Sequence, residues 1–343
     1  MTAGRMNKVY NTRETMPDDM ISGFVAAYPS AITQGSNPRI VRRKVLGTHA
    51  GKVALLIGNG SGHEPIAMGF VGKGLLDANV VGDVFTAPSP DAILEGIEDV
   101  TGEAGAVLLI SRHEGDVING NAAAFMAQES GFDVRPLLMY DDISSAPKGQ
   151  EDERRGAAGT MFIYKILGAA AETGMGLDDL VRLGEDVRSV TRTLGAALFP
   201  GTSPLTGERM FELPPDEIAI GMGVHGERGA GHRHHAPARE LVRDIVNALL
   251  EDRPIAAGTD TVVLVNGSGG TTMMELLTIY GEVASYLGDK GIPTRSPMIG
   301  SFSTTQEMGG FSISLLTPTT EMARFWCAPH GAPFFPIISG MGD

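Results

Sequence analysis

Three glycine-containing segments of this 343-residue chain carry side chains that could do acid–base or nucleophilic chemistry. They place His63 in GNGSGHEP, Asp116 in SRHEGD and His225 in GMGVHGERG. Histidine titrates near neutral pH, and its neutral ring is also a competent nucleophile. An aspartate can accept the proton of a substrate hydroxyl. These three residues are therefore our candidates for catalysis.

The first segment follows an aliphatic stretch that we expect to be a strand, Lys52–Ile57. Gly60, Ser61 and Gly62 would let the backbone approach a ligand closely, although a tight turn without a ligand explains them equally well. The spacing matches neither the dinucleotide fingerprint nor the Walker loop. His63 favours a ligand, because it follows the carboxyl end of a strand, where open α/β sheets bind ligands.

The other two candidates each have a structural alternative. Asp116 follows a glycine and precedes an expected helix, so that it could be either an N-cap or a proton acceptor. His225 lies between glycines that shield it little, so that its ring could approach a carbonyl carbon or bond within a turn. Local sequence leaves both choices open.

Two further segments are weaker candidates. Gly267–Gly270 precedes an expected helix and could hold a phosphate there, but packing between elements is favoured. His232–His235 could bind a metal, but no carboxylate stands at helical spacing from it, and a solvated loop is favoured. We therefore predict no metal site.

The elements that must position these residues repeat one pattern: an aliphatic strand, a turn containing glycine, and a helix. In the first half we expect further strands at Asn79–Val84, Ala106–Ile110 and Val134–Tyr140, a helix capped by Ser89, and helices at Asn121–Glu129, Thr160–Glu172 and Leu177–Arg192. Such alternation is typical of parallel α/β sheets.

The pattern is interrupted at Phe199–Pro215, where prolines and glycines disfavour any regular element. It resumes with strands expected at Glu217–Gly221, Thr261–Val265 and Phe311–Leu316 and helices at Val242–Leu250 and Thr271–Leu287. We therefore predict two α/β lobes, residues 1–198 and 199–343, with mostly parallel sheets and a ligand site at the carboxyl ends of strands.

Composition restricts the class of protein. The net charge of −14 argues against nucleic acid as a partner. Cys327 is the single cysteine, which excludes an intrachain disulfide. No apolar signal segment or membrane-spanning run is present, so we expect a cytoplasmic location and no membrane partner. Because no Walker loop or protein-kinase signature occurs, any nucleotide used in phosphoryl transfer would lie on another chain.

Together these segments resemble the substrate-binding K subunit (DhaK) family of dihydroxyacetone kinase. The matching stretches are GNGSGHEP at 58–65, GFVGKGLLDANVVGDVFTAPSPD at 69–91, GD at 115–116, RRGAAGT at 154–160 with Lys165 after it, and GMGVHGERG at 221–229. They follow one another in order over nearly the whole chain. The combination of GSGHEP with GMGVHGE is highly specific.

The resemblance implies a homodimer of two-lobed chains that acts as a phosphotransferase subunit with dihydroxyacetone (glycerone) as acceptor. His225 would bond through Nε2 to the substrate carbonyl as a hemiaminal. His63 and Asp116 would bind the terminal hydroxyl and help to deprotonate it, and Gly60–His63 would line the pocket.

The resemblance also implies a division of labour between chains. This chain would bind no cofactor, and a separate L subunit would carry ADP or ATP with Mg²⁺. A phosphotransferase-system protein would recharge that nucleotide from phosphoenolpyruvate. Because no L-like domain follows within the 343 residues, the chain resembles the separate K subunit rather than the fused form.

The second segment departs from the family pattern. Relatives usually have Lys-Asn-Tyr where this chain has Ser-Arg-His at 111–113, followed by Glu114. Ser111 is still expected to bind substrate but cannot supply the charge of the lysine. Arg112, if it were on a strand, would point to the opposite face. Arg228 also replaces a usual proline. A four-carbon ketose such as erythrulose is therefore a second substrate hypothesis.

Two other functions stay open. A non-catalytic regulator would bind the ketose and signal its presence to a transcription factor, although the presence of His63 and Asp116 weighs against it. A short-sugar isomerase would use the same two residues without a phosphate. A nicotinamide oxidoreductase is disfavoured by the missing dinucleotide fingerprint.

Overall fold

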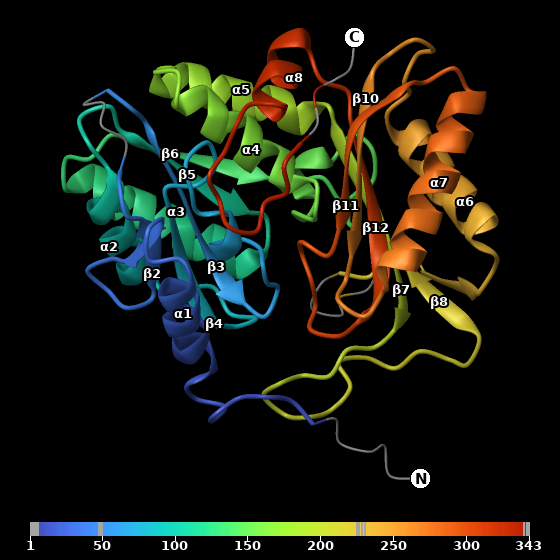
Figure 1. Ribbon diagram of the computed structural model, residues 1–343, viewed down its shortest axis with the longest axis horizontal. Helices are drawn as coiled ribbons and strands as arrows, with labels where there is room; N and C mark the ends of the chain where they lie inside the picture. Colours follow the sequence, from blue (N-terminus) through green and yellow to red (C-terminus); the bar gives the residue numbers. More distant parts are fainter. Residues whose placement is uncertain are drawn as a thin grey trace.

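The computed structural model describes residues 7–46, 51–223, 227, 229, 231–338 and 340. His225 and Arg228 lie outside the described residues. The described residues form two sheets of six strands, each with helices packed against it (Figure 1). The two α/β lobes predicted from the sequence are thus confirmed.

The first sheet has the strand order β1-β2-β4-β3-β5-β6, in which the last four strands run parallel. Its strands are β1 (Ile32–Gln34), β2 (Ile40–Arg43), β3 (Ala54–Ser61), β4 (Ala78–Val84), β5 (Ala106–Ser111) and β6 (Val134–Met139). The helices of this half are α1 (Met16–Ala27), α2 (Pro90–Val100), α3 (Glu114–Glu129), α4 (Thr160–Ala171) and α5 (Leu177–Ser189), with the short 3-10 helices η1 (Met68–Phe70) and η2 (Glu151–Glu153).

The central strands of this sheet are buried on both faces, which explains their continuous apolar sequences. Side chains alternate along β3, so that Leu55 packs in a core with α4 and α5, and Leu56 packs in a second core with α2 and α3. The predicted cap of α2 is confirmed, because the Ser89 hydroxyl accepts a hydrogen bond from Ala92 N at 3.3 Å.

The second sheet has the strand order β11-β10-β12-β7-β8-β9. Its strands are β7 (Thr191–Phe199), β8 (Glu217–Ile220), β9 (Gly231–His234), β10 (Thr261–Gly267), β11 (Thr294–Gly300) and β12 (Gly309–Leu316), and the helices that follow its strands are α6 (Ala238–Asp252), α7 (Met273–Asp289) and α8 (Thr320–Trp326). Only the β10–β11 pair is parallel among these strands, whereas three of the five pairings in the first sheet are parallel. The expectation of mostly parallel sheets is therefore wrong for the second sheet, because loops rather than helical crossovers join several of its neighbours.

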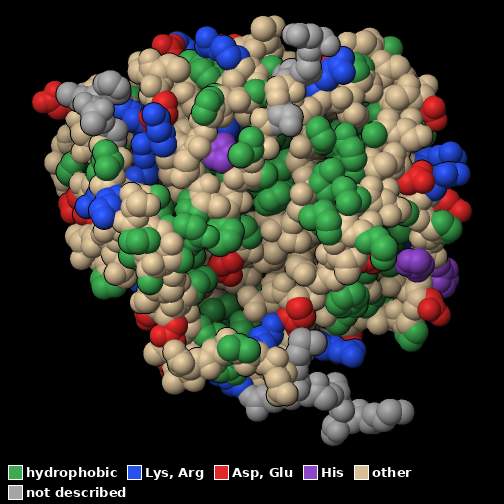
Figure 2. Space-filling model, viewed as in Figure 1, with side chains coloured by type: hydrophobic (Ala, Val, Ile, Leu, Met, Phe, Trp, Pro, Cys, Tyr) green, Lys and Arg blue, Asp and Glu red, His purple; other side chains and the backbone are tan. Residues whose placement is uncertain are grey.

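One hydrophobic core contains residues of both lobes. Helices α6 and α7 cover one face of the second sheet, and the other face packs with α4 and α8. Trp326 of α8 meets Phe162 of α4 with ring centroids 5.1 Å apart. Lys165 is fully buried beside them, and its ammonium donates to Phe325 O at 2.7 Å. Burial lowers the pKa of Lys165 to about 8. On the face shown in Figure 2, hydrophobic side chains gather along the middle and charged ones are scattered around the rim.

Two of the local expectations differ from the structure. The helix expected to reach Arg192 ends at Ser189, and residues from Thr191 onward form β7. The lobe boundary expected after residue 198 lies within β7, a strand of the second sheet. The division into two domains at this residue stays a prediction. The histidine tract is not a loop, because Gly231–His234 pairs antiparallel with β8 as an edge strand.

Candidate active site

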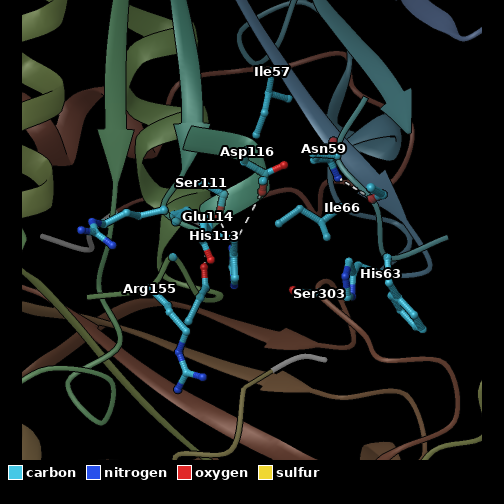
Figure 3. A pocket seen from close by; sticks show the side chains of 18 of the residues that line it. Ile57, Asn59, His63, Ile66, Ser111, His113, Glu114, Asp116, Arg155 and Ser303 are labelled. Carbon is cyan, nitrogen blue, oxygen red and sulfur yellow. Dashed lines mark hydrogen bonds and ion pairs between the residues drawn. The ribbon is translucent and has the colours of Figure 1, made fainter. Parts of the chain in front are cut away.

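A cavity of about 450 Å³ opens between the lobes, at the carboxyl ends of β3, β4 and β5 (Figure 3). Its wall includes Asn59, Gly60, His63, Phe85, Ser111, Arg112, His113, Glu114, Asp116, Arg155, Tyr164, Glu227 and Ser303. This position agrees with the ligand site predicted at the strand ends.

His63 stands on one side of the cavity and is fixed by the second lobe. Its Nδ1–H donates to Thr304 O at 2.7 Å, and Thr304 N–H donates to His63 O at 3.0 Å. With its proton on Nδ1, the neutral ring has Nε2 as its basic nitrogen. The Phe85 ring packs against the imidazole with centroids 5.0 Å apart. Phe85 has φ +57°, a left-handed backbone that is uncommon outside glycine and concentrated at functional sites.

The turn before His63 is held by the carboxylate that follows it. Glu64 Oε1 accepts a hydrogen bond from Gly62 N at 2.8 Å, and Glu64 O accepts one from the Thr304 hydroxyl at 2.8 Å. Burial raises the pKa of Glu64, while the bond from Gly62 N lowers it. Gly62 has φ +103°, and a Cβ there would stand 2.5 Å from the Phe85 ring. The glycine is therefore required by the turn itself.

Asp116 faces the cavity from the first turn of α3 (Figure 3). The helix begins at Glu114 with His113 as N-cap, so that Asp116 is not the N-cap. Its carboxylate lies where the helix dipole favours negative charge. His113 Nδ1 stands 3.9 Å from Asp116 Oδ2 and 3.1 Å from the Ser111 hydroxyl. The sequence marked His113 as a departure from the family but did not predict this cluster.

Arg155 enters the cavity from the segment before α4. Its guanidinium donates to Asp142 Oδ2 at 2.9 Å and to Gly221 O at 3.2 Å. The following turn is fixed by Asp141, whose carboxylate accepts from Ala157 N at 2.6 Å and Gly159 N at 2.9 Å. Burial raises the pKa of Asp141 to about 6 despite these bonds.

The structure brings most of the predicted residues to one cavity. Gly60, His63, Ser111 and Asp116 all border it. Ser61 and Gly62 instead border a second cavity of about 450 Å³ beside the N-terminal segment, whose wall includes Lys8 and Tyr10.

Two further residues named in the sequence analysis are Arg112 and His225. Arg112 borders the cavity, contrary to expectation, because β5 ends at Ser111. Its guanidinium bonds to Glu153 Oε2 at 2.7 Å. His225 lies outside the described residues, but Glu227, two positions later, borders the same cavity.

Sequence reasoning missed several wall residues, among them Phe85, Arg155 and Tyr164. Phe85 and Arg155 fall inside the stretches quoted for the family resemblance, and that was the only available signal. Burial raises the pKa of Tyr164, and the nearby Asp116 charge acts in the same direction, so that the phenol is neutral. In the described part of the chain, no group of three or more His, Cys, Asp or Glu side chains is arranged to hold a metal ion.

Residues 22–334 match the Dak1 domain family. The chain belongs to this family. It is 38% identical over 311 residues to the dihydroxyacetone-binding subunit DhaK of PTS-dependent dihydroxyacetone kinase 1 from Listeria innocua serovar 6a. The matched region spans 91% of this chain and 94% of that protein. It is 36% identical over 330 residues to D-erythrulose kinase of Mycolicibacterium smegmatis, covering 96% of this chain and 56% of that protein.

Solved structures of the Dak1 family share the fold. The dihydroxyacetone kinase of C. freundii superposes with a TM-score of 0.88 at 33% identity, covering 98% of this chain and 61% of that one. The dihydroxyacetone kinase operon co-activator DhaQ superposes with a TM-score of 0.87 at 31% identity, covering 93% and 98%. Among the described helices, none is both long enough and apolar enough to cross a bilayer.

Proposed function

We propose that this chain is the substrate-binding subunit of a dihydroxyacetone kinase and that it holds the ketose by a covalent bond to His225. Its likeness to a dihydroxyacetone-binding subunit over most of both chains supports the substrate class. One observation carries the mechanism: His63 and Asp116 face a single cavity from the ends of β3 and β5.

The covalent step would proceed by addition. Nε2 of His225 bonds to the carbonyl carbon, the carbonyl oxygen takes up a proton, and the ring releases the proton of its other nitrogen. Only a ketone or an aldehyde can react in this way, so that glycerol is excluded as a substrate. A tethered acceptor is also oriented in advance, which can contribute several kcal/mol to the rate of the next step.

The phosphoryl step would use the two facing side chains. Asp116 and the basic Nε2 of His63 are the two acceptors that face the terminal hydroxyl, and together they help to remove its single proton as the oxygen attacks phosphorus. The bond from His63 Nδ1 to Thr304 O supports this role, because it turns the basic Nε2 away from the protein carbonyl. Phosphoryl transfer depends mainly on positioning and charge, so that acceptor and donor can lie on different chains.

The phosphoryl donor is proposed to lie on a second protein. A separate L subunit would hold ADP or ATP with Mg²⁺ and would be recharged from phosphoenolpyruvate by a phosphotransferase-system protein. The chain would act as a homodimer in the cytoplasm. The test is to mix it with candidate L subunits and a phosphoryl donor and to measure ketose phosphate. Failure to form product with any L subunit, despite ketose binding, would favour a regulator like the co-activator.

A four-carbon ketose is the second candidate substrate, and two observations favour it. The chain is 36% identical to a D-erythrulose kinase. Ser111 and His113 also give one cavity wall two hydrogen-bonding groups, 3.1 Å apart, which could bind an additional hydroxyl. Comparing kcat/KM for dihydroxyacetone with that for D- and L-erythrulose distinguishes the two.

A further inference from the structure

The Arg155 side chain joins the two lobes at the cavity wall. It bonds to Asp142, in the loop after β6 of the first lobe, and to Gly221 O, at the end of β8 in the second. Its Nη1 also lies 3.9 Å from Glu227 Oε2. One guanidinium therefore contacts both described ends of the segment that contains His225.

Asp142 and Ser144 complete this contact from the first lobe. Asp142 Oδ2 accepts from Arg155, and Asp142 Oδ1 lies 2.6 Å from the Ser144 hydroxyl. That hydroxyl is also 2.9 Å from Gly221 O. The Asp142 and Arg155 side chains are only 10% and 15% exposed, so that their charge-assisted bond is weakly screened.

The ends of the His225 segment also close on each other. Gly223 N donates to Glu227 O at 3.0 Å. A Cβ at Gly223 would overlap both the Arg155 guanidinium and the Glu227 carboxylate. The absence of a side chain at this position therefore allows the backbone to rest directly on Arg155.

We infer that Arg155 and Asp142 are positioning residues that hold the base of the His225 segment across the lobe interface. The inference rests on the proposed function, in which His225 bonds to the ketose. A nucleophile must meet a carbonyl carbon within a narrow range of distance and angle, and a displacement of about 1 Å can lower a rate roughly 100-fold. Loosening the segment should therefore slow adduct formation even when no L subunit is present.

The test uses Asp142→Asn and Arg155→Lys in the full chain. Asparagine keeps the shape of Asp142 but loses its charge, and lysine keeps the charge of Arg155 but not its fork of donors. The amide hydrogen exchange rate of the peptide spanning residues 218–231 reports how firmly the segment is held in place. Stopped-flow ketose binding with mass spectrometry measures the rate of adduct formation. Asp179→Asn is the matched control, because it removes a carboxylate that pairs with an arginine on the exposed surface of α5.

Both variants should raise exchange in this peptide about tenfold and slow adduct formation by roughly 10- to 100-fold, whereas Asp179→Asn should change neither. Exchange at β3 should stay at the wild-type rate in all three, which excludes general unfolding. Unchanged exchange in both variants, or faster exchange with an unaltered adduct rate, would overturn the inference. Absence of an adduct in the wild type would overturn the proposed function instead, and the exchange data would still decide whether Arg155 holds the segment.

Discussion

His63 and Thr304 exchange two hydrogen bonds across the lobes: His63 Nδ1 donates to Thr304 O at 2.7 Å, and Thr304 N donates to His63 O at 3.0 Å. One candidate catalytic residue of the first lobe is therefore oriented by the backbone of the second. Because the partner is a carbonyl oxygen, the contact selects the tautomer of the ring as well as its direction.

His63→Gln tests the role of this ring. Glutamine can still form hydrogen bonds but cannot supply a basic nitrogen, so that kcat for ketose phosphorylation should fall by roughly 10²- to 10⁴-fold. Formation of the His225 adduct should persist, because that bond does not involve His63. A steady-state assay with the L subunit measures kcat. Mass spectrometry of the K subunit alone measures adduct formation. A kcat within about a factor of two of wild type would contradict the role.

Asp116→Asn tests the proton acceptor. The amide has nearly the same shape but cannot take the hydroxyl proton, so that kcat should again fall by roughly 10²-fold or more while ketose binding is retained. Glu129→Gln is the matched control, because it removes an exposed carboxylate from the last turn of the same helix, outside the cavity wall. Equal losses in both variants would indicate that α3 needs its negative charge generally and that Asp116 has no special function.

The sequence was sufficient to predict the parts of this site that depend on local order. His63 follows β3, Ser111 ends β5 and Asp116 lies in the first turn of the helix after β5. Strand ends in a parallel sheet meet at one edge. Arg155 could not be assigned a role in this way, because its partners come from a different loop and from the other lobe. Phe85 was missed for a similar reason: only the fold brings its ring to His63.

The errors in the predicted elements likewise arise where distant contacts, and not the local sequence, decide the structure. β7 follows α5 almost directly, so that a helical pattern extended into Arg192. β11 contains Pro297, which disfavours a strand, but it pairs only with β10 at the sheet edge, where a missing N–H is tolerated. Strand direction in the second sheet depends on long connections whose course the local sequence does not specify.

Gly62→Ala tests the tight turn at the cavity. The alanine must adopt φ +103° and place its Cβ 2.5 Å from the Phe85 ring. Gly131→Ala is the matched control, because Gly131 also has a positive φ, +89°, but has open space around it. Both should lose about 1–2 kcal/mol of unfolding free energy from backbone strain. Gly62→Ala should lose more than this and also at least about tenfold in kcat, since Phe85 packs on His63. Urea denaturation and the coupled assay measure the two effects, and equal stability losses in the two variants would contradict the clash.

Asp141 makes stability depend on pH. Burial raises its pKa from 3.8 to about 6, so that between these values the folded state holds a proton that the unfolded state has lost. The contribution of Asp141 to the unfolding free energy should therefore fall as pH rises through this window, by on the order of 2–3 kcal/mol, and stay level above it. Urea denaturation of wild type and Asp141→Asn from pH 4 to 7 measures this. The stability difference between the two should shift steadily toward the variant up to about pH 6; a difference that is constant with pH would contradict the raised pKa.

The central claim is the bond between His225 and the ketose carbonyl, and ¹³C NMR of dihydroxyacetone labelled at that carbon tests it most directly. On binding the wild-type subunit without any L subunit, the labelled carbon should leave the ketone region and give a broad, protein-bound tetrahedral signal. His225→Ala should abolish that signal and the matching mass gain. A bound ketose that keeps its ketone resonance, or a tetrahedral signal that persists in His225→Ala, would contradict the account.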